Sequence, residues 1–125
     1  MMPDEKAQLL ALLMEPGHWC RDAEARDASG VAVRFDDDTA IAWDITGALC
    51  RVFGWRRACV LFEQVERHLI GKPNAFRRSL SNPSIDAMRA LQDFNDRAGM
   101  TFATIRAALE AMPVWQGHLH RRGQL

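Results

Sequence analysis

Apolar residues recur at intervals of three and four positions in five stretches of this chain, which is the spacing that places them on one face of an α-helix. Proline or glycine closes the stretches, and polar residues that can cap a helix, such as Asn82 and Thr101, precede them. Pro83 follows Asn82 at the first helical position, where the backbone needs no N–H donor. The pattern predicts helices at about residues 4–14, 40–53, 57–70, 83–97 and 101–112.

Between residues 18 and 38 the helical spacing is lost. Asp27-Ala28-Ser29-Gly30 has the composition of a tight turn, and the residues from Val31 to Phe35 alternate in part between apolar and polar. This segment is predicted to be a short strand or one arm of a hairpin. The fold class that follows is mainly α, a compact orthogonal array of about five helices with one short β-hairpin.

The composition is typical of one globular domain. The chain has 125 residues, of which 48% are hydrophobic and 26% are charged, and a chain of this length buries one core rather than two. We expect a single helical domain over residues 1–113 and a basic tail over residues 114–125. No apolar run reaches the roughly 18 residues that a membrane span needs, and the first residues do not have the layout of a signal peptide. A cytoplasmic protein is therefore expected.

Charge is distributed unevenly along the chain. Residues 1–44 contain ten acids and four bases, whereas residues 45–125 contain six acids and twelve bases. Halves of opposite charge favour the docking of an acidic face on a basic one, within a molecule or between copies, and an arginine-rich surface also suits an anionic partner. Self-complementarity is the simpler of these interpretations.

The three cysteines predict neither a disulfide framework nor a zinc site, because their number is odd and no pair has C-x-x-C spacing. Cys50 and Cys59 lie on apolar helical stripes, where cysteine behaves as a small hydrophobic residue. Two other groups contain metal-binding residue types, His118 with His120 and the run Asp36-Asp37-Asp38, but neither has the ligand spacing of a known closed site. We expect no metal site and no cofactor.

Several short motifs follow one another along the chain. They are Trp19 after the first predicted helix, then Ala25-Arg26-Asp27-Ala28-Ser29-Gly30, then Trp43-Asp44-Ile45-Thr46-Gly47-Ala48 with Arg51, then Phe94-Asn95-Asp96 with Thr101. In these motifs, and over most of its length, the chain resembles a bacterial family catalogued as domain of unknown function 6197. Members of that family often have cysteine where this chain has Asp44 and tryptophan where it has Phe94. Because the family has no assigned chemistry, the resemblance supports the fold and implies no site.

Asn95 and Asp96 lie between two predicted helices, where such side chains commonly accept backbone N–H bonds and close turns. This structural role is the simpler interpretation. The functional alternative is a small enzyme, in whose cleft acidic, imidazole and thiol groups share a proton or a metal. The candidate catalytic residues are His18, Cys20, Asp44 and Asp96. No phosphate-binding loop or hydrolase motif accompanies them.

Residues 86–112 also have the layout of a helix-turn-helix, with Gly99 at the turn and Ile105 directed inward. Asn95 occupies the position four residues before this glycine, where a small residue is usual. The recognition helix of such a motif would carry Arg106 as its one base, whereas phosphate binding needs several basic residues on the docking face. A DNA-binding regulator is therefore an alternative function, and nucleic acid is not the partner that we expect.

Four tryptophans are many for a chain of this length, and large aromatic side chains are enriched in cores and at interface hot spots. Trp43 lies close to Gly47, where helices can approach each other, and is predicted to be in the core. The candidate partner-binding residues are Trp55, Trp115, Arg56 and Arg57. The function that we prefer from the sequence is a non-catalytic protein-interaction module, whose partner is another protein or a second copy in a homodimer.

Overall fold

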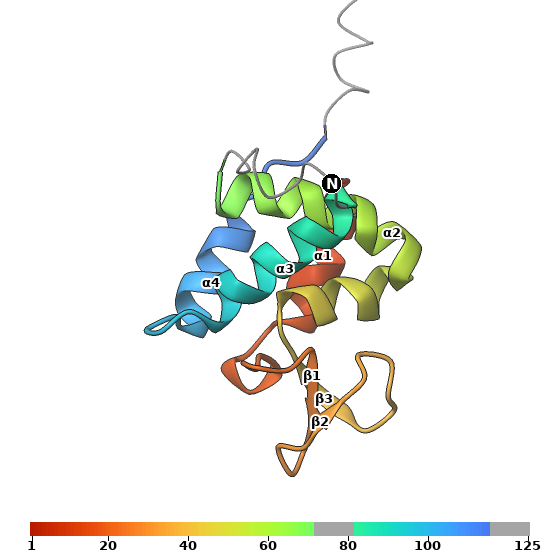
Figure 1. The fold of residues 1–125 in the computed structure, drawn as a ribbon, viewed down its shortest axis with the longest axis vertical. Coiled ribbons are helices and arrows are strands. Elements are labelled where there is room, and N and C mark those ends of the chain that lie inside the picture. The colour runs from red at the N-terminus through yellow and green to blue at the C-terminus, as the bar shows by residue number, and fades with distance from the viewer. Residues whose placement is uncertain (72–81, 116–125) are drawn as a thin grey trace, which may run out of the picture.

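The computed structural model describes residues 1–71 and 82–115, which contain four α-helices and a small sheet. In chain order the elements are α1 (Pro3–Leu12), a 3₁₀ turn η1 (Pro16–His18), β1 (Ala25–Asp27), β2 (Ala32–Val33), β3 (Ala40–Trp43), α2 (Ile45–Leu69), α3 (Pro83–Asp96) and α4 (Phe102–Glu110). The sheet lies at one end of the helical part (Figure 1). The mainly α fold is confirmed. In the described part, however, there are four α-helices where the sequence predicts five, and the predicted hairpin is part of a three-stranded antiparallel sheet. Arg77, Arg78 and residues 116–125 lie outside the described residues.

The sheet has the strand order β2-β1-β3. β1 and β2 are joined by the predicted turn, in which the Asp27 Oδ1 accepts hydrogen bonds from the backbone N–H groups of Ser29 and Val31, both at 2.9 Å. The prediction of a helix from residue 40 is wrong, because residues 40–43 form β3 and pair with β1, with Ala42 opposite Arg26. This long-range pairing outweighs the local helical spacing that the segment shares with the helix after it.

α2 contains the second and third predicted helices. Gly54 lies between them with a φ of 79° and a ψ of 162°, which is not a helical conformation. The helical conformation is therefore interrupted at Gly54, where the sequence predicts the end of a helix, and α2 consists of two helical halves joined by a kink. Because only glycine adopts this positive φ at little cost, the residue type sets the position of the kink.

α3 and α4 begin where their capping signals predict. The side chain of Asn82 accepts a hydrogen bond from the Ser84 N–H at 2.9 Å, and the Thr101 Oγ1 accepts one from the Thr104 N–H at 3.2 Å. Each bond provides an acceptor for a backbone N–H that the first turn of a helix leaves without a partner.

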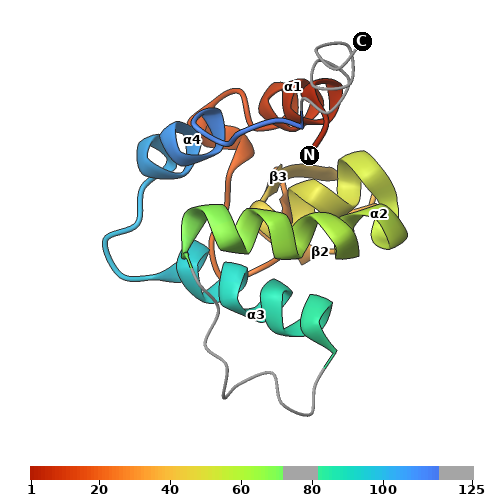
Figure 2. The same ribbon diagram turned by 90° about the horizontal axis from the view of Figure 1, so that it is seen from above.

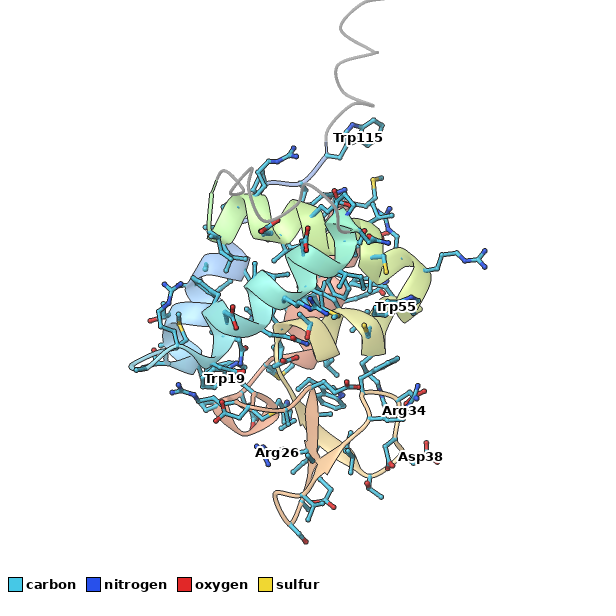
Figure 3. The ribbon with its side chains drawn as sticks, in the orientation of Figure 1. Trp19, Arg26, Arg34, Asp38, Trp55 and Trp115 are labelled. Atoms are coloured by element: carbon cyan, nitrogen blue, oxygen red, sulfur yellow. The ribbon has the colours of Figure 1, made fainter. Side chains whose placement is uncertain are left out.

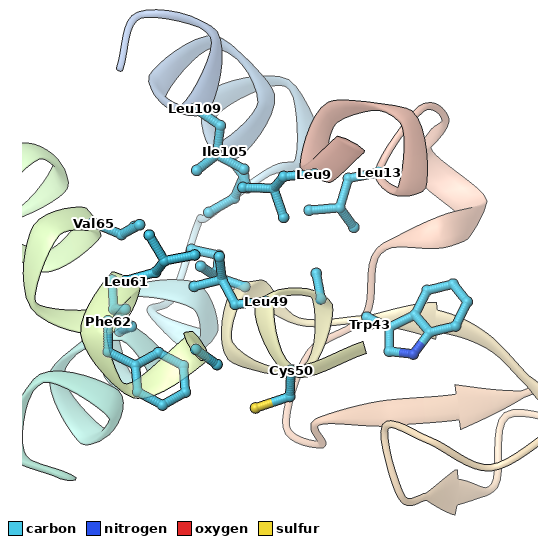
Figure 4. Close-up of a cluster of buried hydrophobic side chains, with 14 of the residues drawn as sticks. Leu9, Leu13, Trp43, Leu49, Cys50, Leu61, Phe62, Val65, Ile105 and Leu109 are labelled. Carbon is cyan, nitrogen blue, oxygen red and sulfur yellow. The ribbon is translucent and has the colours of Figure 1, made fainter. Parts of the chain in front are cut away.

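The helices form three layers (Figure 2). α2 lies in the middle, α3 packs along one side of it, and α1 and α4 cover the other side. The largest buried side chains fill the space around α2 (Figure 4). They include Leu9 and Leu13 from the α1 side, Ile105 and Leu109 from α4, and Leu49, Leu61, Phe62 and Val65 from α2. Trp43 is also buried in this core, as predicted.

A cationic side chain from each of α1 and α4 hydrogen-bonds to backbone carbonyls at the C-terminal end of the other helix. The Lys6 Nζ donates to the backbone carbonyls of Glu110 and Met112, the second at 2.8 Å. The Arg106 Nη1 donates to the carbonyls of Leu10 and Leu13, the second at 2.8 Å. Cations at these positions pair with carbonyls that helix ends leave without partners. Arg106 is thus engaged inside the molecule, which does not favour the DNA-binding alternative.

Candidate functional site

An aspartate that is almost fully buried, Asp44, caps the N-terminus of α2. Asp44 is 2% exposed, and its Oδ1 accepts hydrogen bonds from the Gly47 N–H at 2.6 Å and the Thr46 hydroxyl at 2.9 Å. Its Oδ2 accepts no hydrogen bond from the described residues. Asp44 is therefore the N-cap of α2 through one oxygen, while its other oxygen is left for a different partner.

Gly47 allows a loop to lie directly on this helix start. A Cβ atom at residue 47 would lie 1.9 Å from the backbone oxygen of Glu24, far inside van der Waals contact. The Asp44 N–H also donates to this oxygen, at 3.2 Å. The absence of a side chain at Gly47 thus brings the loop of residues 22–24 against the first turn of α2.

Asn95 connects α3 to both of these segments and is fully buried. Its Oδ1 accepts hydrogen bonds from the Trp19 Nε1–H at 2.8 Å and from the Ile45 N–H at 3.2 Å. Its Nδ2 donates to the Cys20 carbonyl at 3.0 Å and to the Asp96 Oδ1 at 2.9 Å. One amide side chain therefore holds together α3, the N-terminus of α2 and the loop after η1.

Asp96 is fixed on the other side of the same loop. Its Oδ1 also accepts a hydrogen bond from the Asp22 N–H at 2.9 Å, and Asp22 has a φ of 61°, which is uncommon for a residue other than glycine. The Arg21 guanidinium donates to the backbone carbonyls of Asp96 and Arg97, both at 2.7 Å. Arg21 thus pairs with the end of α3 and is hydrogen-bonded to its carbonyls rather than to the Asp96 carboxylate.

These contacts leave an acidic pocket between the loop, the start of α2 and the last turns of α3. Its volume is about 220 Å³, and its lining residues are Asp22, Ala23, Glu24, Asp44, Gln92 and Asp96. Four of the six are acids and none is basic. Arg26 lies nearby in β1, but its guanidinium donates to the carbonyls of Arg21 and Gly30. Ion pairs between described residues join Arg34 to Asp36, Arg57 to Glu5 and Arg106 to Glu110, and none of these six residues lines the pocket.

The buried position of Asp44 changes its protonation. Burial raises the pKa of this carboxyl from its ordinary value of 3.8 to about 7. The hydrogen bonds from Gly47 and Thr46 act in the opposite direction, whereas the negative charges of Asp96 and Glu24 raise the pKa further. Near neutral pH, Asp44 is therefore divided between its neutral and charged forms, and a cation in the pocket would favour the charged form.

An apolar pocket adjoins the acidic one. It is lined by Glu24, Phe35, Thr46, Gly47, Cys50, Trp55, Met88 and Gln92, and it shares Glu24 and Gln92 with the acidic pocket. Trp55 is 48% exposed and packs edge-on against Phe62, with 5.9 Å between ring centroids. The two pockets lie next to each other along α3, and the apolar one is small, at about 50 Å³. We call this pair of adjoining pockets the amphipathic groove.

The structure brings together two of the four candidate catalytic residues, Asp44 and Asp96, on the acidic pocket. His18 lies in η1 and is not among the residues that line it. The Cys20 thiol donates to the Ala23 carbonyl at 3.4 Å, and burial raises its pKa to about 12, with a further contribution from the Asp44 charge. A thiol in this state is not an activated nucleophile.

Of the candidate partner-binding residues, Trp55 and Trp115 lie in different places on the molecule (Figure 3). Trp55 lines the apolar part of the groove. Trp115 lines a separate pocket of about 540 Å³ with Met1, Gln64, Arg67, His68, Met112, Pro113 and Val114, none of which is an acid. Arg57 forms two hydrogen bonds with Glu5, at 2.6 and 2.7 Å, whereas Arg56 is exposed.

Sequence reasoning did not find Asp22, Glu24 and Gln92, which complete the acidic pocket. Asp22 and Glu24 carried no motif, and Gln92 is one polar residue among several on α3. Within the described residues, no group of three or more histidine, cysteine or acidic side chains is placed to hold a metal ion. No helix in that same part of the chain is both long enough and apolar enough to cross a membrane.

A family model described as Family of unknown function (DUF6197) matches residues 3–112, which is most of the chain. The chain belongs to this family. Three of the motifs that resemble this family meet at Asn95, which accepts hydrogen bonds from Trp19 and from the Ile45 N–H at the N-terminus of α2. Membership of DUF6197 supplies no activity. No curated protein and no solved structure matches the chain.

Proposed function

We propose that this chain is a non-catalytic binding module that recognises a cationic side chain of a protein partner in its acidic pocket. The observation that carries the proposal is the composition of the pocket, whose lining includes four acidic residues and no basic one. A site of this kind has a negative potential that increases the affinity for cations and opposes the binding of anions such as nucleic-acid phosphates.

The carboxyl groups of the pocket have hydrogen-bonding capacity left for a ligand. Among the described residues, Asp44 accepts hydrogen bonds at Oδ1 alone, and the two hydrogen bonds that these residues donate to the Asp96 side chain both go to its Oδ1. The two Oδ2 atoms are therefore available to a donor. A guanidinium suits such a pair, because its planar group presents several N–H donors and can bind two carboxylates at once.

The apolar part of the groove supports a side chain with an aliphatic stem. Arginine and lysine bury their methylene groups along apolar surfaces while their charged ends stay in polar surroundings. Met88 and Trp55 offer such a surface next to the carboxylates. A basic residue beside an apolar residue in a partner would therefore contact both ends of the groove.

The pocket supports binding better than catalysis. Asp44, with a pKa of about 7, is suited to proton transfer, but the other groups of the enzyme alternative do not accompany it. The Cys20 thiol is held protonated, and His18 does not line the pocket. The three cysteines are free, which supports the cytoplasmic location that we include in the proposal.

Isothermal titration calorimetry with N-acetyl-arginine amide tests the proposal. We expect a Kd of about 1 mM or tighter, which corresponds to about 4 kcal/mol. Asp96→Asn keeps the Oδ1 acceptor but removes the charge, and it should weaken binding by about tenfold or more, since hydrogen bonds to charged groups contribute about 1.5–3 kcal/mol. The matched control is Asp93→Asn, an exposed residue on the same helix. Equal affinity of the two variants, or no binding by the wild type, would refute the proposed function.

A further inference from the structure

A second pocket lies where the last turns of α2 meet the segment that follows α4. Its volume is about 540 Å³, which is in the range of small-molecule sites. α2 contributes Gln64, Arg67 and His68, and the other lining residues are Met1, Met112, Pro113, Val114 and Trp115. Trp115 marks this pocket at the end of the molecule opposite to the sheet (Figure 3). None of its lining residues lines the amphipathic groove, so the two sites are separate.

Hydrogen bonds between segments far apart in the sequence hold the walls of this pocket. The His68 Nε2 lies 3.2 Å from the Ala108 carbonyl oxygen and donates to it, which ties the end of α2 to α4. The Trp115 N–H donates to the Met1 carbonyl at 2.8 Å, and the Met1 amino group donates to the Gln64 Oε1. The pocket is therefore formed by contacts among the described residues and needs no ligand to assemble it.

The lining of this pocket is mainly apolar and carries positive charge. Its five residues outside α2 are apolar, and no acid lines it. Arg67 is exposed at the edge of this surface, and none of the ion pairs between described residues includes it. A guanidinium without an acidic partner, next to an apolar cavity, is complementary to a ligand that has both an anionic group and an apolar body.

We propose that this pocket binds a small organic acid in which a carboxylate is attached to an aromatic ring. The Arg67 guanidinium pairs with the carboxylate, because its planar N–H donors match the two carboxylate oxygens. The ring packs against Trp115 and the side chains of Met1 and Met112, since aromatic rings form favourable contacts with other rings and with thioether sulfur. This inference goes beyond the proposed function and does not depend on it.

A carboxylate suits this lining better than a phosphate monoester does. A phosphate monoester carries about two negative charges near neutral pH, whereas a carboxylate carries one. Each charge that is placed beside apolar side chains loses favourable hydration, and the loss must be offset by a partner. Arg67 is the one arginine or lysine among the lining residues of the pocket, so the site balances a single negative charge.

Isothermal titration calorimetry of the full chain with 2-naphthoate tests this inference. We expect a Kd of about 1 mM or tighter. Two matched ligands separate the contributions of charge and ring, because 2-naphthamide keeps the ring without the charge and acetate keeps the charge without the ring. Each should bind at least about tenfold more weakly than 2-naphthoate, since each lacks one of the two contacts.

Variants of two exposed lining residues assign these contacts to the pocket. Arg67→Gln keeps a hydrogen-bond donor but removes the charge, and it should weaken the binding of 2-naphthoate about tenfold while changing that of 2-naphthamide little. Trp115→Ala should weaken the binding of both ligands, because both have the ring. The matched control is Arg89→Gln, which removes an exposed arginine of α3 outside the lining and should bind 2-naphthoate as the wild type does.

Three results would overturn the inference. They are a Kd for 2-naphthoate above about 1 mM, equal affinities for 2-naphthoate and 2-naphthamide, and wild-type affinity for 2-naphthoate in either Arg67→Gln or Trp115→Ala. None of these results bears on the acidic pocket, whose ligand and variants are different.

Discussion

Asp44→Asn should remove much of the dependence of stability on pH. In the folded protein, burial raises the pKa of the Asp44 carboxyl from 3.8 to about 7. Between these two values the unfolded chain has released this proton and the folded chain still holds it, so a rise in pH favours unfolding. Stability contributed by the neutral carboxyl is complete below about pH 4 and is lost by about pH 7.

The size of the effect follows from the two pKa values. Each unit of difference corresponds to about 1.4 kcal/mol, so Asp44 alone would lower the free energy of unfolding by at most about 4 kcal/mol between pH 4 and pH 8. Asparagine has nearly the same shape and caps a helix as well as aspartate does. The variant should therefore keep the cap to Gly47 and Thr46 while it lacks the titrating group.

Urea denaturation at several pH values between about 4 and 8 measures this difference. We expect the wild type to lose stability across the range more steeply than Asp44→Asn, and the variant to be the more stable of the two near pH 8. Asp93→Asn serves as the control for loss of one charge from an exposed position. Parallel pH profiles for the wild type and Asp44→Asn would mean that Asp44 titrates at its ordinary pH, and the reasoning about its burial would be wrong.

The remaining predictions concern the frame of the pocket and its ligand. Gly47→Ala should destabilise the protein by about 3 kcal/mol or more, because the new Cβ would overlap the Glu24 backbone. Gly17→Ala is the control, since Gly17 has open space around it, and this variant should unfold at nearly the wild-type urea concentration. Similar unfolding midpoints for the two variants would contradict the close approach of Glu24 to Gly47. Asn95→Ala should cost about 3 kcal/mol in the same assay, because buried groups at Trp19 and Ile45 lose their acceptor; a loss below about 1 kcal/mol would show that water replaces the amide. The affinity for N-acetyl-arginine amide should rise by up to about tenfold from pH 6 to pH 8 as Asp44 ionises, whereas a flat calorimetric profile would exclude Asp44 from the site.

The helices could be predicted from the sequence where a local residue type determines how they begin or end. Asn82 and Thr101 cap the helices that follow them, and the kink at Gly54 depends on the one residue type that adopts its φ easily. The strand β3 was missed because its pairing with β1 is a long-range contact. Ile41 and Ile45 share a helical interval by coincidence, and nothing local separates a strand of four residues from a first helical turn.

The residues of the acidic pocket could be predicted from the sequence only in part, because they too are brought together by long-range contacts. Asp44 and Asp96 are separated by more than fifty positions in the sequence, and Asn95 links their segments through contacts that no spacing reveals. The path of residues 22–24 depends on Gly47 and on the positive φ of Asp22. The sequence therefore offered two of the pocket's acids as candidates, while Glu24 became visible only with the fold.

Two-dimensional ¹H–¹⁵N NMR of the protein measures directly whether the acidic pocket binds a cationic side chain. The ligands are N-acetyl-arginine amide and N-acetyl-citrulline amide, which have nearly the same shape but differ in charge. If the pocket binds a cationic side chain, the arginine ligand shifts the amide signals of Gly47, Gln92 and Asp96, and the citrulline ligand leaves them in place. Equal shifts with both ligands, or arginine-induced shifts confined to residues away from this pocket, would contradict it.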